Sequence, residues 1–371
     1  MPDQAMSNVV GQLAELTTLR DRDLLDTTLA AALRDILRPQ QVAIYRCVGE
    51  EIERRWLMRA RLRLHDLAAA SDPPWAELAQ LPTLDAFPAR LQALREQQVV
   101  VQAGPPQLSV FPLTTDRDVA GVLEITTDQP LDSTDHRLVG GILRIYRNFQ
   151  GLLDYSERDT LTGLLNRKTF DEAFSKLGSS FSPPQLDVTG VAGEQSGEQG
   201  GAHADPATLA LGGLGRRSAL GSQPRYIGVI DIDHFKRVND QHGHLIGDEV
   251  LLLLSRLMRS VFRFHDQLFR FGGEEFVVLM RCHGEADAGV ALERLRSSVK
   301  AFAFPQVGSI SVSAGYSQVL PGDTPASAFE RADRAVYWAK AHGRDQVCSH
   351  AALVARGDLL DQAKVSDVEL F

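Results

Sequence analysis

Apolar and polar positions along the chain follow two periods, which together predict a mixed α/β protein. Residues 8–37 place apolar side chains at largely helical spacing, and Pro39 closes the segment. Alternating and continuous apolar runs predict strands at residues 41–47, 52–64, 99–101, 108–113 and 119–126, and a closing helix from Thr134. We therefore expect an α+β domain at residues 8–150.

The closing helix carries a short heptad seam. Its apolar residues are spaced alternately four and three positions apart, at Leu138, Ile142, Ile145, Phe149 and Leu152. One interpretation is a connecting helix at residues 135–160 that pairs in parallel with a second copy and transmits the state of the first domain. The other is a helix that packs only on its own domain, and the sequence leaves both open.

Residues 178–223 interrupt the pattern. Glycine, serine, proline and glutamine dominate there, and such a composition buries too little apolar surface to offset the entropy of ordering. We expect a flexible insertion, which loop-closure entropy tolerates at small cost. Its composition predicts no function.

A glycine pair between two apolar runs predicts a hairpin with acids at its turn. Residues 267–271 alternate as a strand does, and residues 276–280 are continuously apolar, as in a buried strand. Residues 272–275, Gly-Gly-Glu-Glu, supply the positive φ of a tight turn and two carboxylates. The alternative is an ordinary hairpin with solvated glutamates.

A second acidic stretch favours chemistry over that alternative. Residues 226–232 predict a strand that ends at Asp231, and Lys236 follows closely. An apolar helix is expected at residues 249–258. Carboxylates at a strand end and on a neighbouring turn, with a lysine nearby, indicate a site for a hard cation and phosphate.

These stretches resemble the GGDEF family of diguanylate cyclases, in the variant that carries Gly-Gly-Glu-Glu-Phe. The resemblance covers residues 156–348 apart from the insertion, and its four motifs lie at residues 159–168, 226–248, 270–276 and 332–345. It implies an α/β nucleotide-cyclase-type palm at residues 156–350, with a central antiparallel sheet flanked by helices, and a tail at 351–371. The first motif resembles a structural joint, and residues 309–316 are expected to form a central strand.

The reaction that the resemblance implies joins two GTP molecules into cyclic di-GMP and releases two pyrophosphates. Asp231, Glu274 and the Ile232 carbonyl are then metal ligands for Mg²⁺, with two ions per site, and Mn²⁺ would also suit such oxygen donors. Glu274 is also the implied general base for the 3′-hydroxyl. Glu275 is a further ligand or orients the turn, and Lys236 stabilises charge that develops on phosphate.

The resemblance also implies the substrate contacts. Asn239, His244 and Asp248 match guanine and ribose contacts, and Phe235 lies beside the base or packs in the core. Lys340 and Arg344 reach the β- and γ-phosphates. Without the resemblance, these two cations would be interpreted as partners of a helix C-terminus.

An Arg-x-x-Asp pattern precedes the glycine pair. Arg263 and Asp266 lie where many members of the family bind their product, and arginine suits bidentate contact to phosphate or to guanine. We therefore predict inhibition by cyclic di-GMP.

The first domain resembles GAF-type sensor domains, on residues 109–113, 121–125 and 131–135. That resemblance implies a small-molecule or protein signal of unknown identity. His65 and Cys47 are conceivable haem or metal ligands, but an isolated His or Cys is more often structural or exposed.

Bulk composition sets the remaining limits. The 371 residues carry a net charge of −9, which argues against a general nucleic-acid binder, and no apolar run is long enough to span a membrane. Three scattered cysteines and the absence of a signal-peptide pattern lead us to expect a cytoplasmic protein. The implied reaction needs a homodimer, because each site holds one GTP. A receptor that binds cyclic di-GMP or GTP without catalysis, or a GTP-using enzyme with another product, are the alternatives.

Overall fold

The structure, a computed structural model, describes residues 22–49, 53–73, 76–114, 119–179 and 223–360. The chain divides into two compact units between Thr160 and Leu161. The expected insertion at 178–223 lies almost wholly outside the described residues, as does the start of the first expected helix. Within the described residues no helix is both long and apolar enough to cross a membrane.

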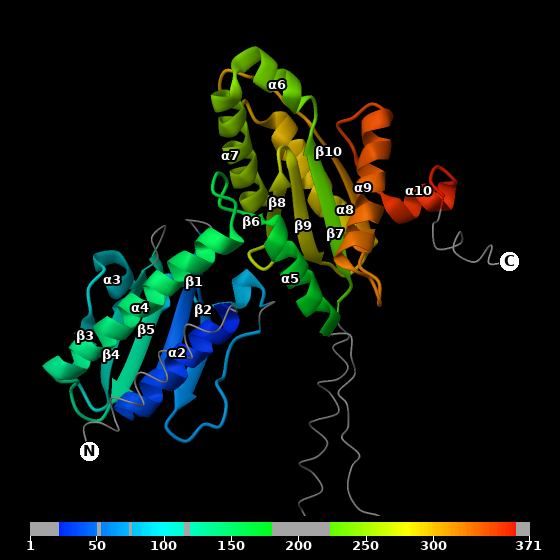
Figure 1. The fold of residues 1–371 in the computed structure, drawn as a ribbon. Helices are drawn as coiled ribbons and strands as arrows, with labels where there is room; N and C mark the ends of the chain where they lie inside the picture. The colour runs from blue at the N-terminus through cyan, green and yellow to red at the C-terminus, as the bar shows by residue number, and fades with distance from the viewer. Residues whose placement is uncertain (1–21, 50–52, 74–75, 115–118, 180–222, 361–371) are drawn as a thin grey trace, which may run out of the picture. The chain divides into compact units, whose positions relative to one another are not determined.

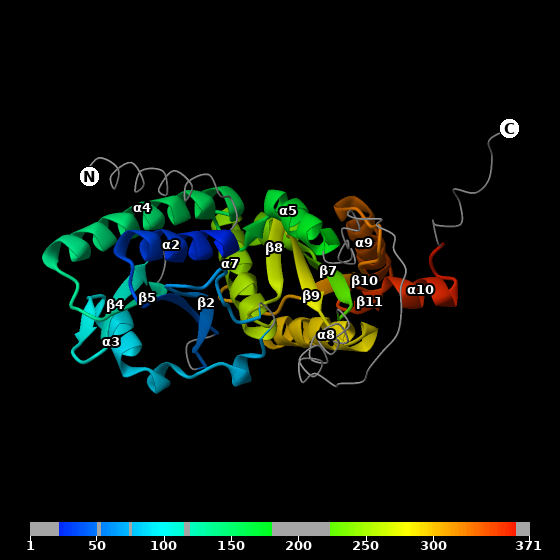
Figure 2. The same cartoon turned by 90° about the horizontal axis from the view of Figure 1, so that it is seen from below.

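The first unit is a five-stranded antiparallel sheet covered by helices on both faces (Figures 1 and 2). The strand order is β2-β1-β5-β4-β3. Helices α2 and α4 pack on one face, and α3 packs on the other against Trp56. The elements are α2 (Arg22–Leu37), β1 (Gln41–Val48), β2 (Arg55–Arg63), the 3₁₀ turns Leu78–Gln80 and Leu84–Ala86, α3 (Pro88–Glu96), β3 (Val100–Gln102), β4 (Gln107–Thr114), β5 (Val119–Thr127) and α4 (Ser133–Glu157). Their order confirms the expected α+β pattern.

A buried polar network fixes which face of α4 turns inward. Arg46 on β1 donates from Nη2 to Asp26 Oδ1 on α2 at 2.7 Å, and both side chains also contact the hydroxyl of Tyr146 on α4. Gln150, one turn further along α4, donates to the same hydroxyl at 2.8 Å. Because buried charges need their partners, this network ties α4 to the sheet and to α2.

This packing buries part of the predicted heptad seam and leaves the other part exposed to solvent. Ile142 lies in the core of its own domain at 2% exposure, whereas Ile145 and Leu152 are 38% and 66% exposed. The inward face instead runs through Val139, Ile142, Tyr146 and Leu153. The helix therefore packs on its own domain through this face and presents a separate apolar stripe to solvent, and its pairing with a second copy stays a prediction.

The second unit is a six-stranded sheet between two helical layers (Figure 2). The order is β11-β10-β7-β9-β8-β6, and the antiparallel pairing expected of the centre is confirmed for β10–β7, β7–β9 and β9–β8. The edge strand β11 pairs in parallel with β10, and the edge strand β6 pairs in parallel with β8. The elements are β6 (Leu165–Asn166), α5 (Arg167–Ser179), β7 (Arg225–Ile232), α6 (Phe235–His242), α7 (His244–Val261), β8 (Gln267–Gly272), β9 (Glu275–Arg281), α8 (Glu285–Ala301), β10 (Val312–Gln318), α9 (Pro325–Ala341), β11 (Val347–Ser349) and α10 (His350–Arg356).

Three expected elements differ from the structure in their bounds or their place. Helix α7 begins at His244, five positions before the expected start, because in its first turn the apolar Leu245 is exposed and the buried position is Gly247, which breaks the apolar period. Strand β10 begins at Val312 and lies between β11 and β7, one place from the sheet edge. The expected tail begins with α10, whose Leu353 is fully buried and whose first turn is capped by the Ser349 hydroxyl.

Candidate active site

The β8–β9 turn has a backbone that favours glycine. Gly272 has φ of 142° and Gly273 has φ of 50°, and a Cβ at either position would meet no atom within 4 Å. Backbone conformation, and not crowding, therefore accounts for the glycine pair. Arg270 on β8 donates to the Gly273 carbonyl from Nη2 at 2.9 Å, which holds the turn in place.

Strand pairing brings the predicted carboxylates together. Asp231 on β7 is the register partner of Glu275 on β9, and Glu274 precedes Glu275 in the turn. Asp231 is only 5% exposed. Its Oδ2 forms an ion pair with Lys340 Nζ on α9, at a distance of 2.7 Å. Residues from β7, the hairpin and α9 thus lie close together.

Burial and neighbouring negative charges raise the pKa values of these three carboxyl groups. Burial is the largest cause for Asp231, Glu274 and Glu275. The charge of Asp231 raises the pKa of both glutamates further, whereas the Lys340 ammonium lowers the pKa of all three groups. An acidic cluster of this kind is stabilised by an added cation.

The cluster fits a hard metal ion in its donor chemistry. The Oδ1 atom of Asp231 is buried and has no hydrogen-bond partner among the residues that the structure describes. Among the described residues, no three His, Cys, Asp or Glu side chains are arranged as a complete metal site. An ion held by Asp231 and Glu274 therefore needs further oxygen donors, and the Ile232 carbonyl predicted from the sequence is of the right type.

The corner between α6 and α7 holds Asn239 in place. Gly243, with φ of 84°, separates the two helices. Gly247 on α7 lies so close to α6 that a Cβ built on it would fall 1.9 Å from Asn239 Oδ1. Only glycine leaves room for the Asn239 side chain in this position, and the sequence-based site did not include Gly247.

The other predicted nucleotide contacts differ in exposure. Lys236, His244 and Asp248 are exposed on α6 and on the first turn of α7. Phe235 is 5% exposed and lies in the main hydrophobic core, so core packing, one of its two expected roles, is observed. Arg344 is exposed on the loop after α9, and among the described residues its guanidinium makes no hydrogen bond or ion pair.

Residues 216–346 match the family model described as "Diguanylate cyclase, GGDEF domain". The chain contains a GGDEF domain. It is 44% identical over 124 residues to diguanylate cyclase DgcP of Pseudomonas aeruginosa, covering 33% of this chain and 18% of DgcP. It is 31% identical over 194 residues to diguanylate cyclase DgcZ of Escherichia coli, covering 52% of each chain. The chain thus spans about half or less of these relatives.

Solved GGDEF domains are also similar. The GGDEF domain of DgcB from Caulobacter crescentus, in complex with c-di-GMP, is 27% identical. The match covers 53% of this chain and 96% of that domain, with a TM-score of 0.39.

Three charged residues of the second unit were missing from the sequence-based site. Asp333 on α9 raises the pKa values of Asp231 and Glu275, and Arg167 on α5 lowers that of Glu275. Asp233 is buried and accepts several hydrogen bonds. Asp333 could have been found, because it lies two helical turns before Lys340 on one face of α9. Arg167 lies too far away in sequence for any local pattern to find it.

The Arg-x-x-Asp pattern of the GGDEF domain forms a tight turn before β8. The Arg263 N–H donates to Asp266 Oδ2 at 3.0 Å, and the Asp266 N–H donates to the Arg263 carbonyl at 2.9 Å. Arg263 is exposed, whereas the Asp266 side chain is 6% exposed. Burial raises the pKa of Asp266 to about 6. Asp266 therefore shapes the turn, and Arg263 is the member that a ligand can reach.

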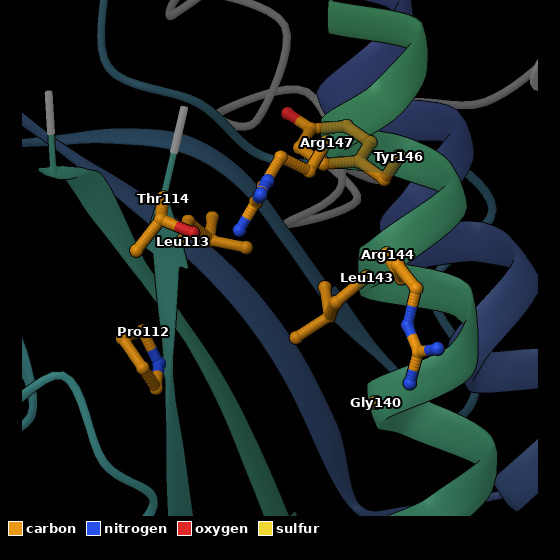
Figure 3. Close-up of a pocket in the computed structure, with 8 residues that line it drawn as sticks. All are labelled: Pro112, Leu113, Thr114, Gly140, Leu143, Arg144, Tyr146 and Arg147. Carbon is orange, nitrogen blue, oxygen red and sulfur yellow. The ribbon is translucent and has the colours of Figure 1, made fainter. Parts of the chain in front are cut away.

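Outside the GGDEF domain, the first unit holds a groove of about 230 Å³ between β4 and α4 (Figure 3). Arg147 extends from α4 toward Leu113 and Thr114 on β4, and Arg144 runs along α4 toward Gly140. The groove is therefore lined by arginines on its helical side. His65 and Cys47, considered from the sequence as haem or metal ligands, lie outside this groove. His65 is on an exposed turn, and Cys47 is on β1.

Proposed function

We propose that this protein is a diguanylate cyclase controlled by its first domain. The observation that carries the proposal is the meeting of Asp231, Glu274, Glu275 and Lys340 beside an intact glycine turn within the GGDEF domain. Curated relatives that match the same region are named diguanylate cyclases. We also propose a cytoplasmic location.

The proposed reaction balances as two identical displacements. The 3′-hydroxyl oxygen of each GTP forms a bond to the α-phosphorus of the other, and each α–β phosphoanhydride bond breaks. Two pyrophosphates leave, and the two hydroxyl protons pass to bases. Because each domain holds one GTP, the reaction needs two GGDEF domains facing each other.

A divalent metal ion, Mg²⁺ or Mn²⁺, would be held by Asp231, Glu274 and the Ile232 carbonyl, with two ions per site in the active form. When bound, it neutralises phosphate charge and lowers the pKa of the attacking hydroxyl. The orphaned Oδ1 of Asp231 supports this assignment. Lys340 now pairs with Asp231, and we propose that it exchanges this partner for the β- and γ-phosphates.

The remaining groups bind and activate the substrate. Glu274 accepts the 3′-hydroxyl proton, and its raised pKa makes it a stronger base than an ordinary glutamate. Asn239, His244 and Asp248 contact the guanine and the ribose. Lys236 stabilises the charge that develops on phosphate, and Glu275 orients the turn.

Regulation acts through two further regions. The exposed Arg263 binds cyclic di-GMP and so produces product inhibition, with Asp266 fixing its turn. The first unit acts as a GAF-like sensor for a small-molecule or protein signal. Its α4 helix presents Ile145, Leu152 and Tyr155, the last 79% exposed, for pairing with a second copy.

The test is a nucleotide assay on purified protein with GTP and Mg²⁺, resolved by chromatography. Wild type is expected to form cyclic di-GMP, and Glu274→Ala is expected to lose at least about a hundredfold in rate, since it removes the base. Glu172→Ala, an exposed glutamate on α5, is the matched control and should retain wild-type activity. A wild type that makes no product, yet retains cyclic di-GMP after purification, would instead indicate a receptor or an inhibited enzyme.

A further inference from the structure

Asp233 follows Asp231 by two residues, yet both of its carboxylate oxygens are used inside the protein. Oδ1 accepts a hydrogen bond from the Ser313 hydroxyl at 2.7 Å. Oδ2 accepts one from the Ser311 hydroxyl at 2.6 Å and one from the Asp345 backbone N–H at 3.0 Å. The side chain is buried, at 5% exposure. This saturation leaves little capacity for a metal ion.

The segment that Asp233 holds has a backbone conformation that is energetically unfavourable. Gly343, Arg344 and Asp345 have consecutive φ values of 110°, 62° and 46°. Two neighbouring residues that are not glycine thus lie in the left-handed region, which persists only when surrounding contacts impose it. The Asp345 carboxylate supplies such contacts through Arg296 Nη1 at 2.6 Å and Lys300 Nζ at 3.1 Å, both on α8.

This anchored loop carries a cation at its tip. The Arg344 N–H donates to the Ala339 carbonyl at 2.9 Å, so the backbone of Arg344 is fixed to the end of α9. Its guanidinium is exposed and, within the described residues, has no hydrogen-bond or ion-pair partner. Lys340, near the end of the same helix, already lies 2.7 Å from Asp231. A fixed backbone with a free cationic side chain beside the site is suited to a phosphate ligand.

We propose that Asp233 is a positioning residue for Arg344 and not a metal ligand. It fixes the Asp345 amide by a hydrogen bond. Because this amide belongs to the peptide that joins Arg344 to Asp345, the bond also fixes the backbone position from which Arg344 reaches the terminal phosphates of GTP. Asp231, with one buried oxygen that lacks a partner in the described part of the chain, keeps the metal role. The identity of the ligand rests on the proposed function, whereas the positioning role rests on the hydrogen bonds alone.

The positioning role is tested without nucleotide by hydrogen exchange of the Asp345 amide. Asp233→Ala removes the acceptor, so the amide is expected to exchange about tenfold faster or more. Asp233→Asn keeps an oxygen for this amide and an N–H for a serine hydroxyl, and should stay close to wild type. Unchanged protection in Asp233→Ala would overturn the proposal.

Nucleotide binding tests the consequence. With Mg²⁺ present, Asp233→Ala is expected to weaken binding of α,β-methylene GTP by about tenfold or more, because the arginine loop is released. Binding of GMP, which lacks the β- and γ-phosphates, should change by less than about twofold. Asp171→Ala, an exposed aspartate on α5, is the matched control.

Two results would contradict this assignment. One is an equal loss for both nucleotides in Asp233→Ala. The other is an Asp233→Asn variant that loses Mg²⁺ dependence as Asp231→Asn does. If wild type binds no α,β-methylene GTP, the proposed cyclase function fails, and the exchange of the Asp345 amide still decides the role of Asp233.

Discussion

Three carboxyl groups with raised pKa values share the end of β7 and the β8–β9 turn, and Lys340 offsets part of their repulsion. The ion pair between Lys340 and Asp231 therefore stabilises the charge of a buried aspartate. In the mechanism that we propose, the same lysine leaves Asp231 for phosphate when a metal ion binds.

This electrostatic coupling predicts the pH dependence of the reaction. Glu274 can act as a base only when it is ionised. Because its pKa is raised, it ionises at a higher pH than an ordinary glutamate, and kcat/KM should therefore rise with pH through that pKa. Glu275→Gln removes a like charge that raises the pKa of Glu274, so the acid limb should move to lower pH. Glu172→Gln serves as the control. An acid limb that stays in place in Glu275→Gln would show that Glu274 is not the group that titrates.

At the scale of elements, the hairpin was predictable because its signals are local. A glycine pair, two acids and an apolar run are contiguous, and each has one structural meaning. The role of Asp233 was not predictable, because its serine partners lie 78 and 80 residues away in sequence. Helix α6 was missed for another reason: His234 before it adopts the left-handed conformation, with φ of 60°.

The α6–α7 corner gives a prediction at this scale. Gly247→Ala would place a Cβ 1.9 Å from Asn239 Oδ1, and the flexible asparagine would move aside. We expect at least about a tenfold rise in KM for GTP with a change in stability below about 1 kcal/mol, because a contact is lost while the core stays intact.

Gly140→Ala is the matched control for this substitution. No atom lies within 4 Å of a Cβ at that position in α4, so helix propensity alone should act and stabilise the protein by about 1 kcal/mol. Steady-state kinetics and thermal unfolding measure both variants. A Gly247→Ala enzyme with unchanged KM would show that Asn239 does not bind the nucleotide.

For the whole molecule, the proposed reaction requires that two catalytic domains meet. The structure leaves Ile145, Leu152 and Tyr155 of α4 exposed while the rest of its apolar face packs on the first unit. The heptad spacing was visible in the sequence, but which of its members face solvent was not, because this depends on the sheet and on the Tyr146 network.

Disrupting this stripe should separate the subunits. Leu152→Glu places a charge on the exposed seam, and light scattering should then report a monomer whose specific activity at equal protein concentration falls at least about tenfold. Leu67→Glu, at a fully exposed leucine in the same unit, is the control and should leave the dimer intact. A dimeric and active Leu152→Glu protein would place the contact between subunits elsewhere.

The most direct test of the account is the mass balance of the reaction. Purified wild-type protein is incubated with GTP and Mg²⁺, and cyclic di-GMP and pyrophosphate are quantified in the same samples over time. The account predicts two pyrophosphates for each cyclic di-GMP, with neither product formed by Glu274→Ala. Pyrophosphate release without a cyclic dinucleotide, or GTP left unchanged by a protein that binds it, would contradict the assignment as a diguanylate cyclase.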